Sequence, residues 1–155
     1  MNTQEYERLA EKYLDCIYCV AVNGCKHHAD AEDVVQNTFV KLWERTESFA
    51  DEEHARKWLI RVAVNECNSL WRSGWKRRTA YLEEMTAEPV YQTAEKSGLY
   101  YAVRELPPKY RQIIYLHYYE EYSIREIAEI MHLSETAVKT RLLRARQKIK
   151  SAMEA

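Results

Sequence analysis

The segment from Ser123 to Ile149 constrains the fold more than any other part of the chain, because it carries the start signals of two consecutive helices. Ser123 and Glu126 have the spacing of a capping box, in which each side chain accepts a hydrogen bond from the other residue's backbone N–H. Ser134 supplies a second N-cap after a turn at His132 and Leu133. A capped helix, a turn and a second capped helix are typical of a helix-turn-helix.

Apolar residues recur at helical spacing after both caps. The first helix has Ile124, Ile127, Ala128 and Met131, and the second has Val138, Leu142, Ala145 and Ile149. The opposite face of the second helix would enter a DNA major groove, with Thr136, Lys139, Thr140, Leu143 and Arg144 as base readers. Arg141, Arg146 and Lys148 flank this face and suit phosphates. The simpler alternative is a solvated basic helix that closes a bundle.

The remaining chain predicts an all-α protein with two small helical domains. Glycine and proline occur only three times each, and they lie between long stretches with helical periodicity. We expect helices over 4–23, 30–44, 51–73, 99–106 and 108–119, with Asp30 as the N-cap of the second. Residues 79–97 are acidic, contain Pro89 and lack periodicity. They predict a flexible linker between a domain at 1–78 and a helix-turn-helix domain at 98–155.

Charge and cysteine usage narrow the class of protein. The net charge of −1 conceals an excess of acids in residues 1–60 and of bases in 135–150, with a second basic cluster at Arg72 and 76–78. This segregation indicates a polyanion bound at two places. No apolar run approaches the roughly 18 residues of a membrane span and no signal peptide is recognisable, so we expect a cytoplasmic protein without membrane insertion. Cys16 and Cys19 form a CxxC pair, which we interpret as core packing, with zinc binding as the alternative.

The predicted helix over 51–73 has a polar stripe opposite its apolar side. Leu59, Val62, Ala63 and Leu70 form the apolar side, and Arg61, Asn65, Asn68 and Arg72 form the stripe. Asparagine can hydrogen-bond a base edge, and Trp71 and Trp75 beside a basic run suit unstacked nucleotides. Core tryptophans beside a solvated face are the alternative.

Three ordered motifs resemble the sigma-70 family of RNA polymerase sigma factors. The segment 30–43 resembles the polymerase-binding helix, and 55–65 resembles the helix that reads and opens the upstream edge of the transcription bubble. The segments 106–111, 122–128 and 138–146 look like the C-terminal domain. The short length resembles the extracytoplasmic-function (ECF) group.

The resemblance implies roles for particular residues. Asp33, Gln36, Asn37 and Trp43 match the contact with core RNA polymerase, and Arg61, Asn65, Asn68 and Arg72 match the minus-ten readers, with Asn65 capturing a flipped base. Thr136, Lys139, Thr140, Leu143 and Arg144 match the minus-thirty-five readers. His132 departs from a frequent glycine, and Asn37 from a frequent glutamate.

The family also implies promoter DNA and an anti-sigma factor as partners, and neither cofactor, metal nor enzymatic activity. No histidine pairs with carboxylates at a catalytic spacing, and no phosphate-binding loop is present. The alternative function is a dimeric helix-turn-helix regulator that binds an operator, which would leave the polar residues of 30–44 and the asparagine stripe without a role. The promoter sequence and the inducing signal do not follow from these residues.

Overall fold

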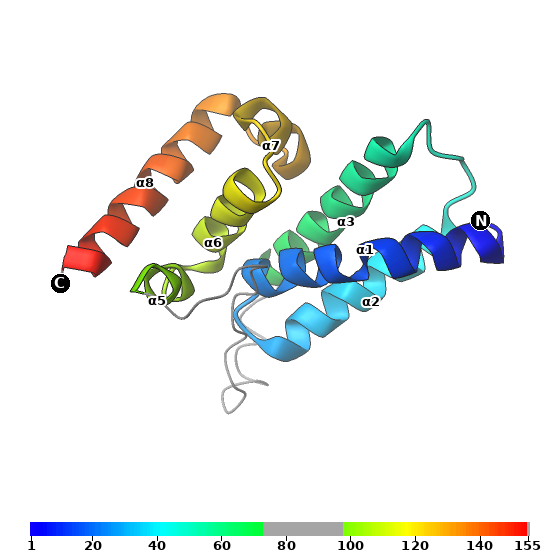
Figure 1. Ribbon diagram of the computed structural model, residues 1–155, viewed down its shortest axis with the longest axis horizontal. Helices are drawn as coiled ribbons and strands as arrows, with labels where there is room; N and C mark the ends of the chain where they lie inside the picture. Colours follow the sequence, from blue (N-terminus) through cyan, green and yellow to red (C-terminus); the bar gives the residue numbers. More distant parts are fainter. Residues whose placement is uncertain (73–97, 155) are drawn as a thin grey trace.

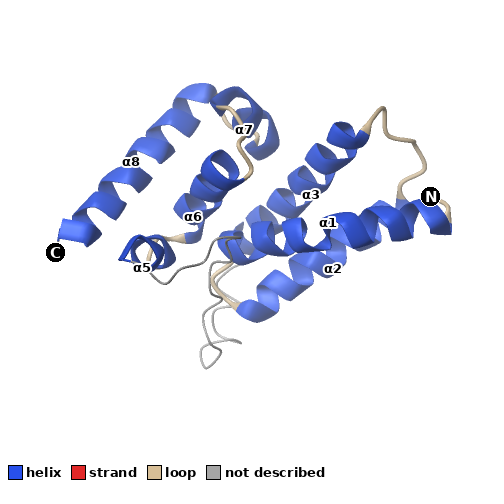
Figure 2. Cartoon of the chain, viewed as in Figure 1, coloured by secondary structure: helices blue, strands red, loops and turns tan. Residues whose placement is uncertain are grey.

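The computed structural model describes residues 1–72 and 98–154, and every regular element in these ranges is helical (Figures 1 and 2). The N-terminal half consists of α1 (Thr3–Gly24), α2 (His28–Glu44) and α3 (Glu52–Arg72). The C-terminal half consists of α5 (Gly98–Arg104), α6 (Pro108–Ile114), the π-helical turn η1 (Tyr115–Tyr119), α7 (Ile124–Met131) and α8 (Glu135–Glu154). The predicted all-α fold is confirmed, and the predicted linker lies outside the described residues.

Local signals account for most helix ends of the N-terminal half. The Asn2 side chain accepts from the Glu5 N–H at 2.8 Å and caps α1, and Asp51 accepts from the His54 N–H at 2.7 Å and caps α3. The prediction of Asp30 as the N-cap of α2 is wrong, because His27 takes that position without a capping side-chain bond and Asp30 is buried in the first turn. In this longer helix the Asp30 carboxylate lies in the first turn, near the positive end of the helix dipole.

The predicted helix over 108–119 is interrupted. Pro108 begins α6 at its first turn, but the hydrogen-bond pattern widens to a π turn at Tyr115. The Tyr115 and Tyr119 rings stack there at 5.9 Å between centroids. The chain then leaves the turn through Glu121, whose φ is 59°. Glu120, which follows the wider turn, contacts helices α1 and α3 of the N-terminal half.

The helix-turn-helix follows its sequence signals closely. Both bonds of the Ser123–Glu126 capping box are present, and the Ser134 hydroxyl accepts from the Ala137 N–H at 3.1 Å. His132 ends α7 in the left-handed region with φ 54° and ψ 45°, so the turn keeps a glycine-like conformation without a glycine. Val138, Leu142 and Ala145 of α8 are buried as predicted, and Ile149 is half-buried.

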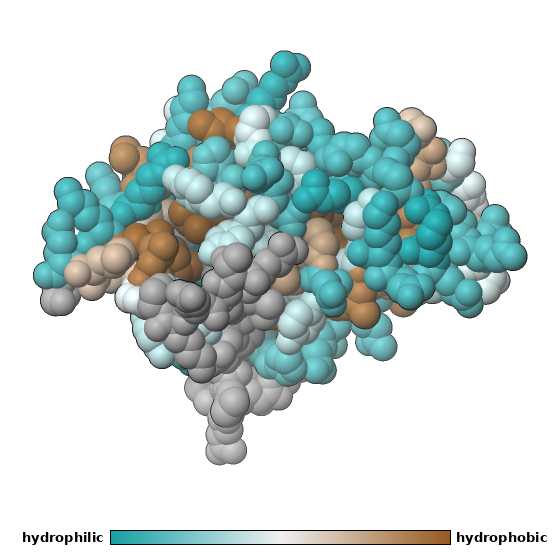
Figure 3. Space-filling view, viewed as in Figure 1, coloured by the Kyte–Doolittle hydropathy of each residue, from teal (hydrophilic) through white to brown (hydrophobic). Residues whose placement is uncertain are grey.

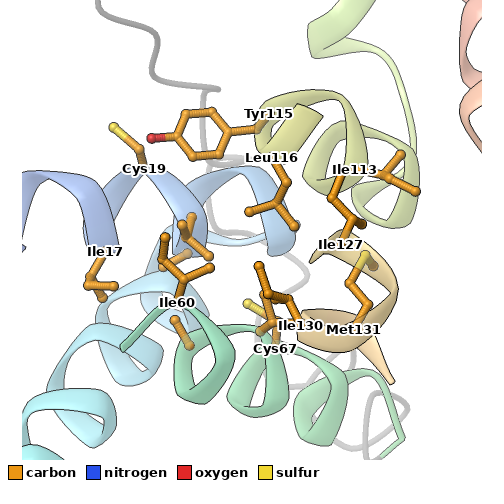
Figure 4. Close-up of a cluster of buried hydrophobic side chains, with 14 of the residues drawn as sticks. Ile17, Cys19, Ile60, Cys67, Ile113, Tyr115, Leu116, Ile127, Ile130 and Met131 are labelled. Atoms are coloured by element: carbon orange, nitrogen blue, oxygen red, sulfur yellow. The ribbon is translucent and has the colours of Figure 1, made fainter. Parts of the chain in front are cut away.

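The two halves pack against each other. In Figure 1, α6 and α7 lie between the N-terminal helices and the outer helix α8, with α6 against α1 and α7 against α3. Figure 4 shows side chains from both halves in one cluster, in which Ile60 and Cys67 of α3 approach Leu116, Ile127 and Ile130. The buried core is therefore continuous across both halves.

This packing explains a second buried face of α3. Sequence reasoning assigned Leu59, Val62, Ala63 and Leu70 to the core, and the first three are buried while Leu70 is half-buried. Ile60, Val64 and Cys67 are also completely buried, and they recur on another side of the helix at spacings of four and three. The C-terminal half covers this side, and the predicted polar stripe remains at least partly exposed.

Candidate functional site

The predicted recognition face of α8 points away from the core. Thr136, Lys139, Leu143 and Arg144 are exposed, and Thr140 is half-buried with its hydroxyl donating to the Thr136 carbonyl at 2.9 Å. Leu143 is 54% exposed although it is a large aliphatic residue. Contact with a thymine methyl group in the major groove would remove this apolar surface from water.

The three predicted phosphate residues differ in their surroundings. Arg146 donates to the Tyr118 hydroxyl at 2.7 Å, and the ammonium of Lys148 lies 5.7 Å from the Tyr110 ring centroid. Both are exposed cations in the C-terminal part of α8. Arg141 is half-buried instead, and burial lowers the pKa of its guanidinium.

The predicted stripe of α3 lies on one surface. Arg61, Asn65 and Asn68 are half-buried, and Arg72 is exposed at the end of the helix. The Arg61 Nε is buried and has no hydrogen-bond partner within the described ranges. Trp71 is half-buried against the core, and its indole N–H donates to the Gly24 carbonyl at 2.8 Å. Trp75 and the basic run 76–78 lie outside the described residues.

The predicted polymerase face of α2 is uncovered. Gln36 and Asn37 are exposed and Asp33 is half-buried, while the Asn37 amide lies 3.5 Å from Glu66 of α3. Trp43 is 48% exposed, and its ring meets Tyr6 edge-on at 5.2 Å.

Sequence reasoning missed Val40 on the same face, which is also 48% exposed. Val40 follows Gln36 by four residues and precedes Trp43 by three, and this helical spacing alone predicts that it lies on the same face.

Arg111 joins the two halves. It is only 2% exposed, and its guanidinium donates to the carbonyls of Val22, Asn23 and Cys25 at 3.3, 3.4 and 2.5 Å. These carbonyls lie at the C-terminal end of α1, where the helix dipole is negative and the last turn has no basic residue. Arg111 of α6 therefore caps α1 from the other half of the molecule.

Glu120 forms a second junction below the π turn. It accepts from the Tyr115 hydroxyl at 2.6 Å and from the Cys16 thiol of α1 at 3.4 Å, and it pairs with Arg56 of α3. Burial, followed by the bond to Glu120, raises the pKa of Tyr115 well above its ordinary value, which keeps the phenol protonated as a donor. A single carboxylate thus joins η1 to both α1 and α3.

The packed arrangement brings the predicted DNA-contacting groups of both halves together. Asn68, Trp71 and Arg72 of α3 line a pocket of about 280 Å³ with Met131, Leu133 and Arg141 of the helix-turn-helix. Figure 3 shows that hydrophilic side chains cover most of the visible face around the smaller apolar patches. A DNA duplex is far wider than this pocket, so DNA cannot enter it in this arrangement.

The predicted packing role of the cysteines is consistent with the structure. All four are free thiols, with Cys19, Cys25 and Cys67 buried and Cys16 half-buried. Within residues 1–72 and 98–154, no group of three or more His, Cys, Asp or Glu side chains could hold a metal ion. None of the helices described in these ranges is long and apolar enough to cross a membrane.

Comparisons with known proteins match both halves. Residues 9–77 match sigma-70 region 2, and residues 97–149 match sigma-70 region 4. The RNA polymerase sigma factor SigV of Bacillus subtilis strain 168 is 31% identical over 132 residues, which cover 83% of this chain and 78% of SigV. The ECF RNA polymerase sigma factor SigM of the same strain is 28% identical over 152 residues, which cover 94% of this chain and 93% of SigM.

Solved structures have the same fold. The sigma factor RpoE, in a co-crystal with the anti-sigma factor NepR from Bartonella quintana, aligns with a TM-score of 0.74 at 20% identity and covers 99% of both chains. CnrH in complex with the cytosolic domain of CnrY aligns with a TM-score of 0.65 at 24% identity and covers 99% of this chain and 90% of CnrH. With regions 2 and 4 matched in order, the chain belongs to the ECF group of the sigma-70 family and is a promoter-recognising sigma factor of RNA polymerase.

Proposed function

We propose that the α2 face formed by Asp33, Gln36, Asn37, Val40 and Trp43 binds core RNA polymerase. The observation that carries this assignment is the exposure of Val40 and Trp43, each 48%, on a helix whose opposite side is buried. Apolar residues of this size beside amides and a carboxylate are typical of a protein interface. The helix α2 packs against α1 and α3, and Gln36, Val40 and Trp43 are exposed at the surface in the packed arrangement.

The stripe of α3 is assigned to the minus-ten element. Asn65 lies between Arg61 and Arg72, where its amide can both donate to and accept from the edge of an unstacked base. Capture of that base offsets the few kcal/mol needed to remove it from the stack. Binding energy from this surface therefore contributes to strand opening, while the polymerase performs the catalysis and this chain is not an enzyme.

The exposed face of α8 is assigned to the minus-thirty-five element. Lys139 and Arg144 can donate to guanine in the major groove, and Leu143 can contact a thymine methyl. Arg146 and Lys148 contact phosphates and fix the register. Arg141 lies in the pocket with Asn68 and Arg72, so its use as a phosphate contact requires the C-terminal half to move away from α3.

The affinity for core polymerase tests the α2 assignment. Asp33→Ala combined with Gln36→Ala should weaken polymerase binding with unchanged helical circular dichroism, because both side chains lie at the helix surface. Gln4→Ala, which truncates an exposed amide of α1, is the matched control. Polymerase affinity equal to that of the control would refute the assignment.

Opening of a promoter tests the α3 assignment. Asn65→Ala should spare polymerase binding and reduce the permanganate reactivity of thymines around minus ten, and a template mismatched in that region should restore it. Equal opening of the paired template by wild type and Asn65→Ala would contradict base capture. A wild-type chain that binds DNA as a dimer without polymerase and never opens it would favour the operator-binding regulator instead.

The same proposal includes a cytoplasmic site of action with the polymerase, and an anti-sigma factor as regulator. RpoE and CnrH are each bound to another protein in the structures that this chain resembles. An anti-sigma factor that stabilised the packed arrangement would keep the pocket between α3 and α8 closed to DNA.

A further inference from the structure

Two thiols meet beneath the junction of the two halves. The Cys25 Sγ lies 3.8 Å from the Cys67 Sγ, and both residues are buried, at 2% and 0% exposed. Cys25 follows the end of α1 in an extended conformation, whereas Cys67 is inside α3. One partner therefore belongs to a segment outside any helix, where a small backbone adjustment does not break helical hydrogen bonds.

The C-terminal half covers this pair. A Cβ added to Gly24 would lie 2.4 Å from the Gln112 Nε2 and 2.7 Å from the Cys67 Sγ, so only glycine allows α1, α3 and α6 to approach this closely. Figure 4 shows Cys67 beside Ile130 and Met131 of α7. Arg111 then holds the Cys25 carbonyl itself at 2.5 Å. Separation of the halves would remove all of these covering groups.

We infer that Cys25 and Cys67 are a redox pair that hydrogen peroxide converts to a disulfide when the C-terminal half lifts away from α1 and α3. One thiolate attacks the peroxide, the O–O bond breaks, and a sulfenic acid and water form. The second thiol attacks the sulfenic sulfur, the S–S bond forms, and a second water leaves. Two thiols are oxidised and one peroxide is reduced to two waters.

The geometry and electrostatics of the pair agree with this gating. A disulfide needs an S–S distance of about 2.05 Å, so the sulfurs must approach by less than 2 Å, which rotation of the Cys25 side chain and a small shift of its segment can supply. In the packed arrangement the hydrogen bond to Cys25, together with burial, raises the pKa of the Cys67 thiol well above its ordinary value. The thiol form is unreactive, so the pair is protected until water reaches it.

Hydrogen peroxide treatment of the full chain tests the site. After alkylation of free thiols, peptide mapping by mass spectrometry should find one intramolecular link, Cys25 to Cys67, in the wild type and in a Cys16→Ser, Cys19→Ser variant. Cys25→Ser should lack it. A wild type in which both thiols remain alkylatable, or in which Cys16 and Cys19 are linked instead, would overturn the inference.

Two lysine variants test the gating, because both remove one partly exposed ion pair at the surface without changing a core residue. Lys57 pairs with Glu126 across the halves at 2.7 Å, whereas Lys41 pairs with Glu66 within the N-terminal half at 2.5 Å. Lys57→Gln should accelerate disulfide formation about two- to fivefold, the factor expected for an exposed ion pair, and Lys41→Gln should not. Equal rates in these two variants would show that docking does not gate the pair.

Discussion

Replacing Arg111 by methionine should separate the two halves. The guanidinium has one short and two longer hydrogen bonds to carbonyls at the end of α1, and methionine keeps most of the buried volume while removing all three. A hydrogen bond from a charged donor contributes about 1.5–3 kcal/mol, and the two longer bonds contribute less. We expect docking to weaken by about 2–4 kcal/mol, or roughly 30- to 1000-fold in the docking constant.

Small-angle scattering of the free protein measures this change. A compact chain of 155 residues has a radius of gyration of about 15 Å, and the variant should exceed this value because its halves move apart. Lys109→Met is the matched control, since Lys109 is exposed on the same helix and loses the same charge. Helical circular dichroism establishes that both variants are folded. If folded Arg111→Met scatters like Lys109→Met, then Arg111 does not hold the halves together.

Three other changes have directions that the structure sets. His132→Gly should stabilise the protein by about 0.5–1 kcal/mol in urea unfolding, because His132 has a φ of 54° that glycine adopts without strain; a loss of stability would contradict this reading of the turn. Arg144→Ala should lose about 1–3 kcal/mol of DNA-binding free energy at particular base pairs. Lys148→Ala should weaken binding to all promoters alike and lower the slope of log affinity against log salt concentration by about one. Equal effects of both variants on every promoter would mean that the recognition face is wrongly assigned. The bonds from Lys57 and then from the Ser123 backbone lower the pKa of Glu126 below its ordinary 4.5, so this carboxylate stabilises the packed arrangement above that pH and loses its contribution as the pH falls through its lowered pKa. Only the bond from Lys57 crosses between the halves, so scattering should report a modest weakening of docking in acid, and Glu126→Gln should weaken docking slightly at neutral pH and flatten this pH dependence.

Sequence reasoning succeeded where a signal lies within a few residues. The Ser123–Glu126 capping box and Ser134 predicted the helix-turn-helix, because a cap depends only on its own first turn. Periodicity likewise predicted the exposed face of α8. Sequence reasoning failed at the start of α2, which begins at His28 and not after Asp30. It also failed at Tyr115, where stacked tyrosines accompany a π turn.

The docking of the halves could not be predicted from local periodicity. Ile60, Val64 and Cys67 have regular spacing, but their partners lie about 50 to 70 residues later in the chain. Arg111 and Gln112 resemble solvent-exposed residues in sequence and yet are buried on α6. Burial of such residues depends on a partner surface, which no window around them contains. The same limit applied to Glu120, whose partners come from three different elements.

The polar character of the junction decides how strongly the halves can hold each other. Arg111 stabilises docking through the end of α1, but the Gln112 amide beside it is fully buried and has no nitrogen or oxygen partner within the described residues. Its buried contact is the Cys67 thiol, which is a weak hydrogen-bond partner, so desolvation of this amide costs up to about 1–3 kcal/mol and opposes part of the contribution from Arg111. In the separated form water would satisfy both side chains, so each is compatible with a surface as well as with an interface. We therefore expect polymerase and promoter DNA to reverse docking, since a partner that binds only the separated form shifts the equilibrium by mass action.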